Sequence, residues 1–460
     1  MERKKYDLII IGWGKAGKSI AAKMGTLGKK VALIEKDENM FGGTCINVGC
    51  LPTKSLVHSS KLLKQIEKYG LERDYEYNNI FFKNSIEKKN QMVKRLNLKN
   101  FGLLEKNPNV DIYLGVASFI SEKEVQVSSE KGEGILFADK IIINSGSTPR
   151  TLDIPGLSSS KNILTSKEAL DLENLPEKLL IVGAGYIGLE FASYFSNFGS
   201  KVSVFQFDNN FLTREDKEDA DFMKEVLIEK GITFSFETSI KKIKDINENV
   251  EVTFEKSGIE KVEVFNKILV AVGRKPNIDD LLLKNAGIEI NTAGEIIVDE
   301  KLKTSNPNVW AAGDVKGGAQ FTYISLDDSR IILPQLLENE SSRTTLNRVN
   351  YPTTTFIDPP FSRVGLNEKE AKEKNIKYTK KYLLSSAIPK AHVIEETDGF
   401  SKILINENDE IIGATLFHYE AHELINLIAL AIQTKTKYQL LRDFMYSHPT
   451  FIESLNDILA

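Results

Sequence analysis

The first forty residues alternate apolar runs with an amphipathic stretch, a pattern that predicts a strand, a helix and a second strand. The apolar run Leu8–Ile11 leads directly into the glycine-rich turn Gly12–Gly17. After the helical stretch, a second apolar run, Val31–Ile34, ends at the acidic residue Glu35. This order predicts a βαβ unit with parallel strands.

The same pattern returns in the middle of the chain. The apolar run Leu179–Val182 leads into a second glycine-rich turn, and the run Lys201–Phe205 ends at Gln206. Each marker of the second copy lies 171 positions after its counterpart in the first: Gly183 after Gly12, Gly185 after Gly14, Gly188 after Gly17, Gly199 after Gly28 and Gln206 after Glu35. Two copies in phase favour two dinucleotide sites over two unrelated glycine-rich turns.

The chemistry of the motif explains its residues. Glycines let the backbone approach a pyrophosphate at a helix N-terminus, where N–H groups and the helix dipole favour anions. Glu35 stands where an acid accepts hydrogen bonds from an adenosine ribose. We therefore expect a tightly held FAD in one module and an exchanging nicotinamide coenzyme in the other, with hydride passing to the flavin.

Composition narrows the class of protein. The 460 residues correspond to roughly three domains. Basic and acidic residues nearly balance, 60 against 64, which gives no reason to expect nucleic acid as a partner. No apolar run approaches the length of a membrane span, and the first one ends at Gly12, too short for a signal peptide. We expect a cytoplasmic protein without membrane contact.

The chain has only two cysteines, Cys45 and Cys50, in a segment that begins with two glycines. One close pair is too little for a disulfide scaffold or a structural zinc site. In a reducing compartment, such a pair is more often catalytic. We expect a redox-active disulfide, with a helix starting near the cysteines and lowering a thiol pKa.

The segment Gly42–Lys54 resembles the active-site segment of the pyridine nucleotide–disulfide oxidoreductases, which include dihydrolipoamide dehydrogenase, glutathione reductase and mercuric reductase. Further segments that resemble the same family are Ile143–Arg150, Val272–Asn277, Trp310–Val315 and His448–Glu453. The resemblance implies an α/β fold with two Rossmann-like dinucleotide-binding domains, as in glutathione reductase, and a C-terminal α+β dimerisation domain. The expected boundaries are 1–150 and 276–346 for the two parts of the FAD domain, 151–275 for the NAD(P)H domain and 347–460 for the dimerisation domain.

The resemblance also implies roles. Cys50 would lie against the flavin, and Cys45 would attack the substrate. His448, oriented by Glu453, would be the acid and base for Cys45 across the interface of a homodimer, consistent with the need of a nucleophilic thiol for an oriented base.

The expected cofactor contacts follow from the same motifs. Lys54 and Glu190 would pair beside the flavin ring, Tyr186 would cover the nicotinamide pocket, and Asp314 would reach the ribityl chain. The full set of expected FAD and coenzyme residues is Gly12, Gly14, Lys15, Ala16, Gly17, Glu35, Lys36, Gly43, Thr44, Lys54, Ala117, Ser145, Gly146, Asp314, Phe321, Thr322, Gly183, Gly185, Tyr186, Ile187, Gly188, Glu190, Gln206, Gly273 and Arg274.

Local strings narrow the choice within the family. No cysteine follows Cys50, which excludes a C-terminal redox pair. Gly12–Lys18, Phe321–Asp328 and Pro359–Gly365 resemble the bacterial reactive-chlorine-resistance flavoproteins, which are associated with reduction of hypothiocyanous acid and copper(II). We expect reduction of a small thiol-reactive oxidant, most of all hypothiocyanous acid. The alternatives are a dihydrolipoamide dehydrogenase or other small-disulfide reductase, and a FAD-binding redox sensor without fast turnover.

Gln206 departs from the group, which often has Glu at this position. No base precedes Arg214 after this strand, and Asp208 lies close by, so we expect NADH to be preferred and NADPH to be used measurably. We expect no metal site. His418 and His422 have the spacing of a helical metal pair, but the strand-like run Gly413–Phe417 places them at a strand–helix junction. The sequence assigns no role to these histidines, nor to His58 or His392.

Overall fold

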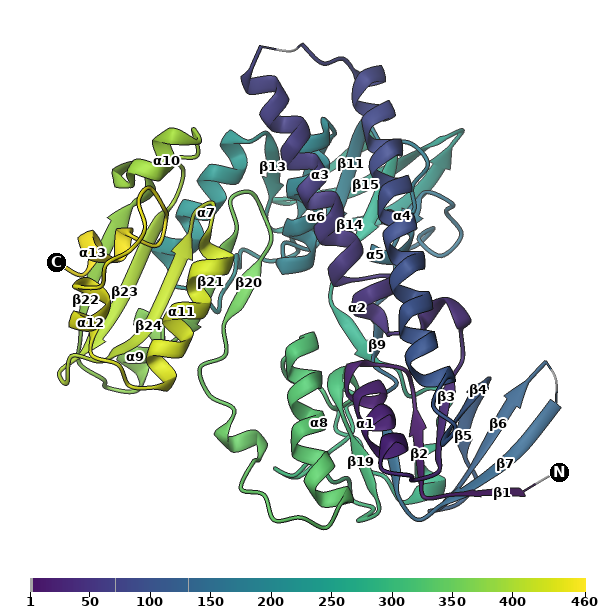
Figure 1. Cartoon of the computed structure of the whole chain (residues 1–460). Coiled ribbons are helices and arrows are strands. Elements are labelled where there is room, and N and C mark those ends of the chain that lie inside the picture. The colour runs from purple at the N-terminus through teal and green to yellow at the C-terminus, as the bar shows by residue number, and fades with distance from the viewer. Residues whose placement is uncertain (1–2, 71, 131) are drawn as a thin grey trace. The chain divides into compact units, whose positions relative to one another are not determined.

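The computed structural model describes residues 3–70, 72–130 and 132–460, and Figure 1 shows its helices and strands. The chain divides into two compact units. Unit 1 contains residues 1–55, 86–150 and 273–348, and unit 2 contains residues 56–85, 151–272 and 349–460. The chain first passes between the units within the helices α3 (Cys50–Lys68) and α4 (Tyr75–Glu105), and it crosses again after residues 150, 272 and 348.

Unit 1 is built on a parallel five-stranded sheet in the order β19-β8-β2-β3-β4. Its strands are β19 (Val309–Ala311), β8 (Ile141–Ile143), β2 (Leu8–Ile11), β3 (Val31–Glu35) and β4 (Val110–Leu114). Alternate residues of β2 point to opposite faces. Leu8 and Ile10 pack with α1 (Lys15–Thr26) and α8 (Thr322–Leu336), which lie side by side in Figure 1.

The opposite face of this sheet carries Ile9 and Ile11, which pack against a second sheet in the order β1-β7-β6-β5. Its strands are β1 (Arg3–Tyr6), β7 (Gly132–Ala138), β6 (Glu124–Ser129) and β5 (Val116–Phe119). Both faces of β2 are therefore covered, which explains its uninterrupted apolar sequence. A short antiparallel pair, β9 (Ser147–Pro149) and β18 (Arg274–Pro276), joins the segments that leave and re-enter the unit.

Unit 2 repeats the topology of the first sheet. Its parallel sheet has the order β10-β17-β11-β12-β13, so β11 has the same kind of neighbours as β2. The strands are β10 (Ile163–Leu164), β17 (Lys267–Val270), β11 (Lys178–Val182), β12 (Lys201–Phe205) and β13 (Ile232–Ser235). The helices α5 (Ser166–Ala169), α6 (Tyr186–Phe198) and α7 (Lys217–Glu229) and the antiparallel strands β14 (Thr238–Ile246), β15 (Asn249–Lys256) and β16 (Ile259–Phe265) belong to the same part.

The C-terminal part of unit 2 is an antiparallel sheet in the order β20-β21-β24-β23-β22. The strands are β20 (Thr353–Thr355), β21 (Phe361–Gly365), β24 (Ile411–Phe417), β23 (Phe400–Asn406) and β22 (Tyr378–Leu384). The helices are α9 (Glu368–Glu373), α10 (Pro389–Val393), α11 (Ala421–Gln433), α12 (Tyr438–Arg442) and α13 (Ser454–Ile458). The apolar face of α11 packs on this sheet, and the mixed architecture agrees with the expected fold class.

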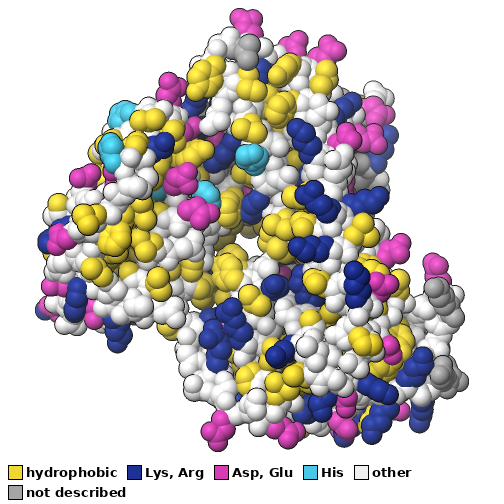
Figure 2. Space-filling model, in the orientation of Figure 1, with side chains coloured by type: hydrophobic (Ala, Val, Ile, Leu, Met, Phe, Trp, Pro, Cys, Tyr) yellow, Lys and Arg dark blue, Asp and Glu magenta, His cyan; other side chains and the backbone are white. Residues whose placement is uncertain are grey.

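The surface carries both signs of charge, and Figure 2 shows basic, acidic and apolar side chains on the visible face. Among the described residues, no helix combines the length and the apolar character that crossing a membrane requires.

Candidate active site

The first glycine-rich turn lies between β2 and α1. Gly12 has a φ of +99°, and a Cβ there would lie 2.4 Å from the carbonyl oxygen of Asn144, so only glycine fits. The helix α1 starts at Lys15 with no side-chain cap and no acidic residue in its first turn. Its N-terminus therefore fits the pyrophosphate of FAD.

Glu35 closes this turn from the end of β3. The backbone N–H of Trp13 donates to its Oε2 over 3.0 Å, and the N–H of Lys36 donates to its Oε1 over 2.8 Å. Burial raises the pKa of Glu35, and these backbone donors act in the opposite direction. The carboxylate is thus fixed beside the turn, where we expect it to meet a ribose.

Asn144 connects the first glycine-rich turn to the segment after β19, although no role was expected for it from the sequence. Its Oδ1 accepts from the backbone N–H of Gly17 over 2.9 Å, and its Nδ2 donates to the carbonyl of Ala312 over 2.7 Å. The side chain is buried. The detectable signal was a polar residue directly after the apolar run of β8, where a buried amide needs a specific partner.

The segments that follow β8, β17 and β19 in the chain meet in unit 1. The hydroxyl of Ser147 donates to Asp314 Oδ2 over 2.8 Å, and Arg274 donates to the Ser147 hydroxyl and carbonyl over 2.7 and 2.6 Å. The N–H of Asn277 donates to the carbonyl of Gly146 over 3.0 Å. Burial lowers the pKa of Arg274, and Asp314, followed by Cys50, raises it. The expected residues Ser145, Gly146, Gly273, Arg274 and Asp314 therefore share one region.

Two residues that we expected to contact FAD pack against protein side chains in the structure. Ala117 lies in β5 with its side chain in the apolar core between the two sheets. Phe321 precedes α8, and its ring stacks on Tyr323 with centroids 5.0 Å apart. Their contacts with FAD stay predictions.

The cysteines lie at the starts of two helices, whereas we expected one helix to start near them. Cys45 lies in the first turn of α2 (Thr44–Asn47), and Cys50 is the first residue of α3. Thr44, an expected cofactor contact, is the first residue of α2. Behind the cysteines, Asn47 holds the segment by donating to the carbonyls of Phe41 and Gly43 over 3.1 and 2.9 Å.

The surroundings of Cys45 differ from the expectation. Its hydrogen bond with Cys50, and then burial, raise the pKa of the Cys45 thiol, whereas we expected a lowered value. Thr322 and Lys18 act in the opposite direction. The sulfur of Cys50 lies 3.6 Å from the hydroxyl of Thr322 at the start of α8. The thiols thus interact with each other, as a pair that closes a disulfide must.

Lys18 is a second residue without an expected role. It lies in the first turn of α1, and its ammonium donates to Asn100 Oδ1. Burial, followed by the neighbouring Lys15, lowers the pKa of Lys18 to about 8, whereas Cys45 raises it. A cation that interacts with Cys45 favours the thiolate.

The second glycine-rich turn has the same construction as the first. Gly183 has a φ of +108°, and a Cβ there would lie 2.7 Å from the carbonyl oxygen of Ala271. The N–H of Ala184 donates to Gln206 Oε1 over 2.9 Å, as Trp13 does to Glu35. Nothing lies within 4 Å of a Cβ built on Gly185, so the start of α6 has open space for a pyrophosphate.

Helix α6 carries Tyr186 as its first residue, followed by Ile187, and Glu190 one turn later. Tyr186 donates to Glu215 Oε1 over 2.7 Å. Glu190 is buried and accepts from the N–H of Phe356 over 2.8 Å. Lys54 lies in unit 1, and its pairing with Glu190 stays a prediction.

The C-terminal motif has the expected internal geometry. His448 Nδ1 lies 2.9 Å from Glu453 Oε2, and the N–H of Thr450 donates to Glu453 Oε1 over 3.2 Å. The side chain of His448 is 72% exposed, whereas that of Glu453 is 16% exposed. The carboxylate orients the ring through Nδ1, and the role of His448 as acid and base stays a prediction.

The remaining histidines have other surroundings. His418 follows β24 and His422 lies in α11, so the pair does straddle a strand–helix junction. His418 stacks on Phe451, with centroids 5.2 Å apart, and burial lowers its pKa to about 3. His58 lies on α3, and His392 lies 2.7 Å from the carbonyl of Ser386. Within the described ranges, no cluster of three or more metal-ligating side chains occurs.

The family follows from comparison with known proteins. Residues 6–329 match the pyridine nucleotide-disulphide oxidoreductase family, and residues 351–458 match its dimerisation domain. The chain belongs to this family and is an FAD-dependent flavoprotein disulfide reductase that uses a nicotinamide nucleotide.

Among curated relatives, a probable pyridine nucleotide-disulfide oxidoreductase, RclA, of Escherichia coli is 39% identical over 99% of both chains. A mercuric reductase of Staphylococcus aureus is 32% identical over 98% of this chain and 81% of its own. A dihydrolipoyl dehydrogenase of Staphylococcus aureus is 30% identical over 97% of this chain and 94% of its own.

Solved structures agree in fold. The HOCl-induced flavoprotein disulfide reductase RclA from Escherichia coli superposes with a TM-score of 0.90 at 38% identity, over 99% of both chains. The Cu(II) complex of the same protein superposes with a TM-score of 0.92, also over 99% of both chains. The resemblance drawn from the motifs is therefore confirmed, and the chain is related to RclA.

Proposed function

We propose that this flavoprotein uses NADH to reduce a small thiol-reactive oxidant, most of all hypothiocyanous acid, in oxidative-stress defence. The observation that carries the proposal is the isolated pair Cys45 and Cys50, which interact at the starts of α2 and α3. These two are the only cysteines of the sequence. RclA of Escherichia coli is an HOCl-induced reductase, and this relationship supports the same class of oxidant.

In the proposed reaction, Cys50 and Cys45 act in sequence. When bound, FAD would supply an electron pair taken from the nicotinamide as hydride. Cys50 would accept this pair as the disulfide opens, which leaves both cysteines reduced. The Cys45 thiolate attacks the sulfur of hypothiocyanous acid and forms a sulfenyl thiocyanate, while the hydroxyl group takes a proton and departs as water. Cys50 then attacks the Cys45 sulfur, closes the disulfide and expels thiocyanate. The oxidant gains two electrons and the dithiol loses two.

His448 supplies the proton in this scheme. Its Nδ1 faces Glu453, so the other ring nitrogen is the one that exchanges protons. The ring is exposed on its own chain and lies in the dimerisation domain. In the proposed homodimer, it serves Cys45 of the other subunit, which the family resemblance implies.

An oxidant panel tests the function. NADH consumption should be fast with hypothiocyanous acid and slow with oxidised glutathione. Copper(II) belongs in the panel because a related structure is a Cu(II) complex. Dihydrolipoamide with NAD⁺ tests the second candidate, which the dihydrolipoyl dehydrogenase relatives favour. Fast turnover only with dihydrolipoamide would overturn the proposal, and slow turnover with every compound would favour a redox sensor.

A further inference from the structure

Tyr186 is tethered at the start of the coenzyme helix. It is the first residue of α6, directly after Gly185, and its hydroxyl donates to Glu215 over 2.7 Å. The residue is 37% exposed, so the ring faces solvent while its hydroxyl is held. Burial, followed by the Glu215 carboxylate, raises the pKa of Tyr186 and keeps the phenol a donor.

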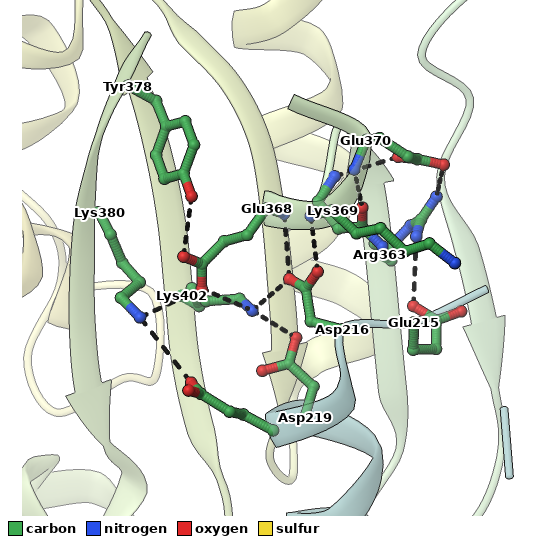
Figure 3. Close-up of polar contacts among 12 residues, drawn as sticks. Glu215, Asp216, Asp219, Arg363, Glu368, Lys369, Glu370, Tyr378, Lys380 and Lys402 are labelled. Carbon is green, nitrogen blue, oxygen red and sulfur yellow. Dashed lines mark hydrogen bonds and ion pairs between the residues drawn. The ribbon is translucent and has the colours of Figure 1, made fainter. Parts of the chain in front are cut away.

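The second carboxylate oxygen of Glu215 pairs with Arg363 of the C-terminal sheet. Its Oε2 lies 3.4 Å from Nη1 of Arg363 on β21, and Nη2 of Arg363 donates to Glu370 over 2.9 Å. Figure 3 shows Arg363 between these two carboxylates. The side chain of Glu215 is 6% exposed, so the carboxylate is buried and paired. It therefore has little freedom to follow a moving tyrosine.

The backbone around Glu215 is also held. Arg363 and Asn367 both donate to the carbonyl of Arg214, each over 2.9 Å. Asp216, which follows Glu215, accepts hydrogen bonds from the first two N–H groups of α9, as Figure 3 shows. Leu212, at the start of this loop, has a φ of +47°, a conformation that a leucine keeps only when its surroundings impose it. The sheet β20–β24 and α9 thus fix the position of Glu215.

We propose that Glu215, fixed by Arg363, is a positioning residue that holds the Tyr186 ring ready for the nicotinamide coenzyme. This inference rests on the proposed binding of that coenzyme at the start of α6. The open space over Gly185 and the exposed ring of Tyr186 lie at the same helix end. A coenzyme whose pyrophosphate binds there must pass or contact the ring.

The tether acts by preorganisation. A free tyrosine ring loses rotamer freedom when a ligand orders it, whereas a tethered ring has lost it beforehand. Removal of the tether should therefore weaken coenzyme binding by about two- to tenfold. It should not alter the reaction between the reduced cysteines and the oxidant, because that half-reaction takes place without the coenzyme.

Rapid-mixing measurements on the FAD-loaded enzyme test the inference. Tyr186→Phe keeps the ring and removes the donor, and Glu215→Met removes the acceptor while Arg363 retains Glu370. Each variant should raise the Kd for NADH in flavin reduction by about two- to tenfold, and the double variant should raise it no further. The rate at which the reduced enzyme reacts with hypothiocyanous acid should stay unchanged.

Tyr378→Phe is the matched control, because Tyr378 donates to Glu368 over 3.0 Å in a similar pair on β22. It should leave the Kd unchanged. Unchanged or tighter NADH binding in the tether variants, or effects that add in the double variant, would overturn the positioning role. Failure of the proposed function looks different, since the reduced wild-type enzyme would then react slowly with hypothiocyanous acid, whatever the Kd for NADH in the tether variants.

Discussion

At the scale of the residue, one ammonium group sets the surroundings of Cys45 apart from those of an ordinary buried thiol. Lys18 is half-buried, bonds to Asn100 and interacts electrostatically with Cys45. The hydrogen bond with Cys50 and burial disfavour the Cys45 thiolate, and Lys18 favours it. The electrostatic surroundings of Cys45 thus include a residue outside the cysteine segment.

Lys18→Met should raise the pH at which Cys45 becomes reactive by about half a unit to one unit, because it removes a cation that stabilises the thiolate. The measurement is the pH dependence of alkylation by iodoacetamide in a Cys50→Ser background, where Cys45 is the one remaining cysteine. Lys23→Met changes an exposed lysine of the same helix and serves as the control. An identical alkylation midpoint with and without Lys18 would remove this role.

Gln206 and Asp208, at the end of β12, bear on the choice between NADH and NADPH. Both ends of the Gln206 amide are engaged, with Oε1 accepting from Ala184 and Nε2 donating to Asp208 over 2.9 Å. Hydrogen bonds from Gln206, and then Asn210, lower the pKa of Asp208. An ionised carboxylate near the end of β12 disfavours a 2′-phosphate.

We therefore expect NADH to be preferred over NADPH. Gln206→Glu should sharpen the preference by weakening NADPH, and Asp208→Asn should relax it. The ratio of kcat/KM for the two coenzymes in each variant measures this. A wild type that favours NADPH would show that a basic side chain, such as that of Arg214, meets the phosphate.

Single residues differed in how far the sequence revealed them. The glycines were predictable because the close approach of another backbone leaves no room for a Cβ, as at Gly12 and Gly183. Asn144 and Lys18 were not, since their roles depend on partners distant in the sequence, Ala312 and Cys45. We expected the helix start to lower a thiol pKa, but the neighbouring thiol and burial raise the pKa of Cys45.

At the scale of the element, a buried lysine joins three segments of unit 2. The ammonium of Lys402 on β23 lies 2.6 Å from both Asp216 and Asp219, at the start of α7, and 3.4 Å from Glu368 on α9. Its side chain is 3% exposed. Figure 3 shows these side chains converging on the lysine. Removing one partner of such a cluster leaves buried charge uncompensated.

Asp219 makes this junction sensitive to pH. Burial raises its pKa from 3.8 to about 6, despite Lys402. A carboxyl group with a raised pKa favours folding below its unfolded pKa, and that contribution is lost as the pH rises through about 6. Asp219→Asn removes this dependence. The free energy of unfolding of the variant, relative to wild type, should therefore rise by about 1 kcal/mol between about pH 5 and about pH 7.5.

Chemical denaturation at both pH values measures the difference. Asp221→Asn is the control on the same helix, because hydrogen bonds from Lys217 lower the pKa of Asp221. It should show no such rise. A relative stability of Asp219→Asn that falls with rising pH would mean that the ion pair with Lys402 outweighs burial.

The parallel strands were the most predictable elements. Leu8–Ile11 in β2 and Leu179–Ile181 in β11 are buried on both faces, so each reads as an unbroken apolar run. The antiparallel strands β14–β16 carry polar residues on their exposed face, and pairing between segments distant in sequence, such as β1 with β7, leaves no local signal. The Lys402 cluster was not predictable from the sequence either, because its members come from segments that are distant in sequence.

At the scale of the whole molecule, the residues expected to be catalytic lie in different parts of the chain. Cys45 and Cys50 belong to unit 1, whereas His448 and Glu453 belong to unit 2, within the dimerisation domain. The family resemblance predicted this division, which local patterns alone did not. In the proposed homodimer, each active site uses both subunits.

His448→Ala should slow reduction of the oxidant by about two to four orders of magnitude, the usual effect of removing a general acid or base. Flavin reduction by NADH should be nearly unchanged. Rapid mixing of each half-reaction measures both rates, and Glu453→Gln should produce a smaller change in the same direction. Equal slowing of both half-reactions would contradict the assignment.

The two cysteines have different roles in the proposed mechanism, and the absorbance spectrum of the FAD-loaded variants tests these roles most directly. Cys45→Ser leaves Cys50 as a thiolate against the flavin and should show a long-wavelength charge-transfer band. Cys50→Ser should lack the band, and both variants should lose turnover with hypothiocyanous acid. A band in Cys50→Ser, or full turnover in either variant, would contradict the mechanism.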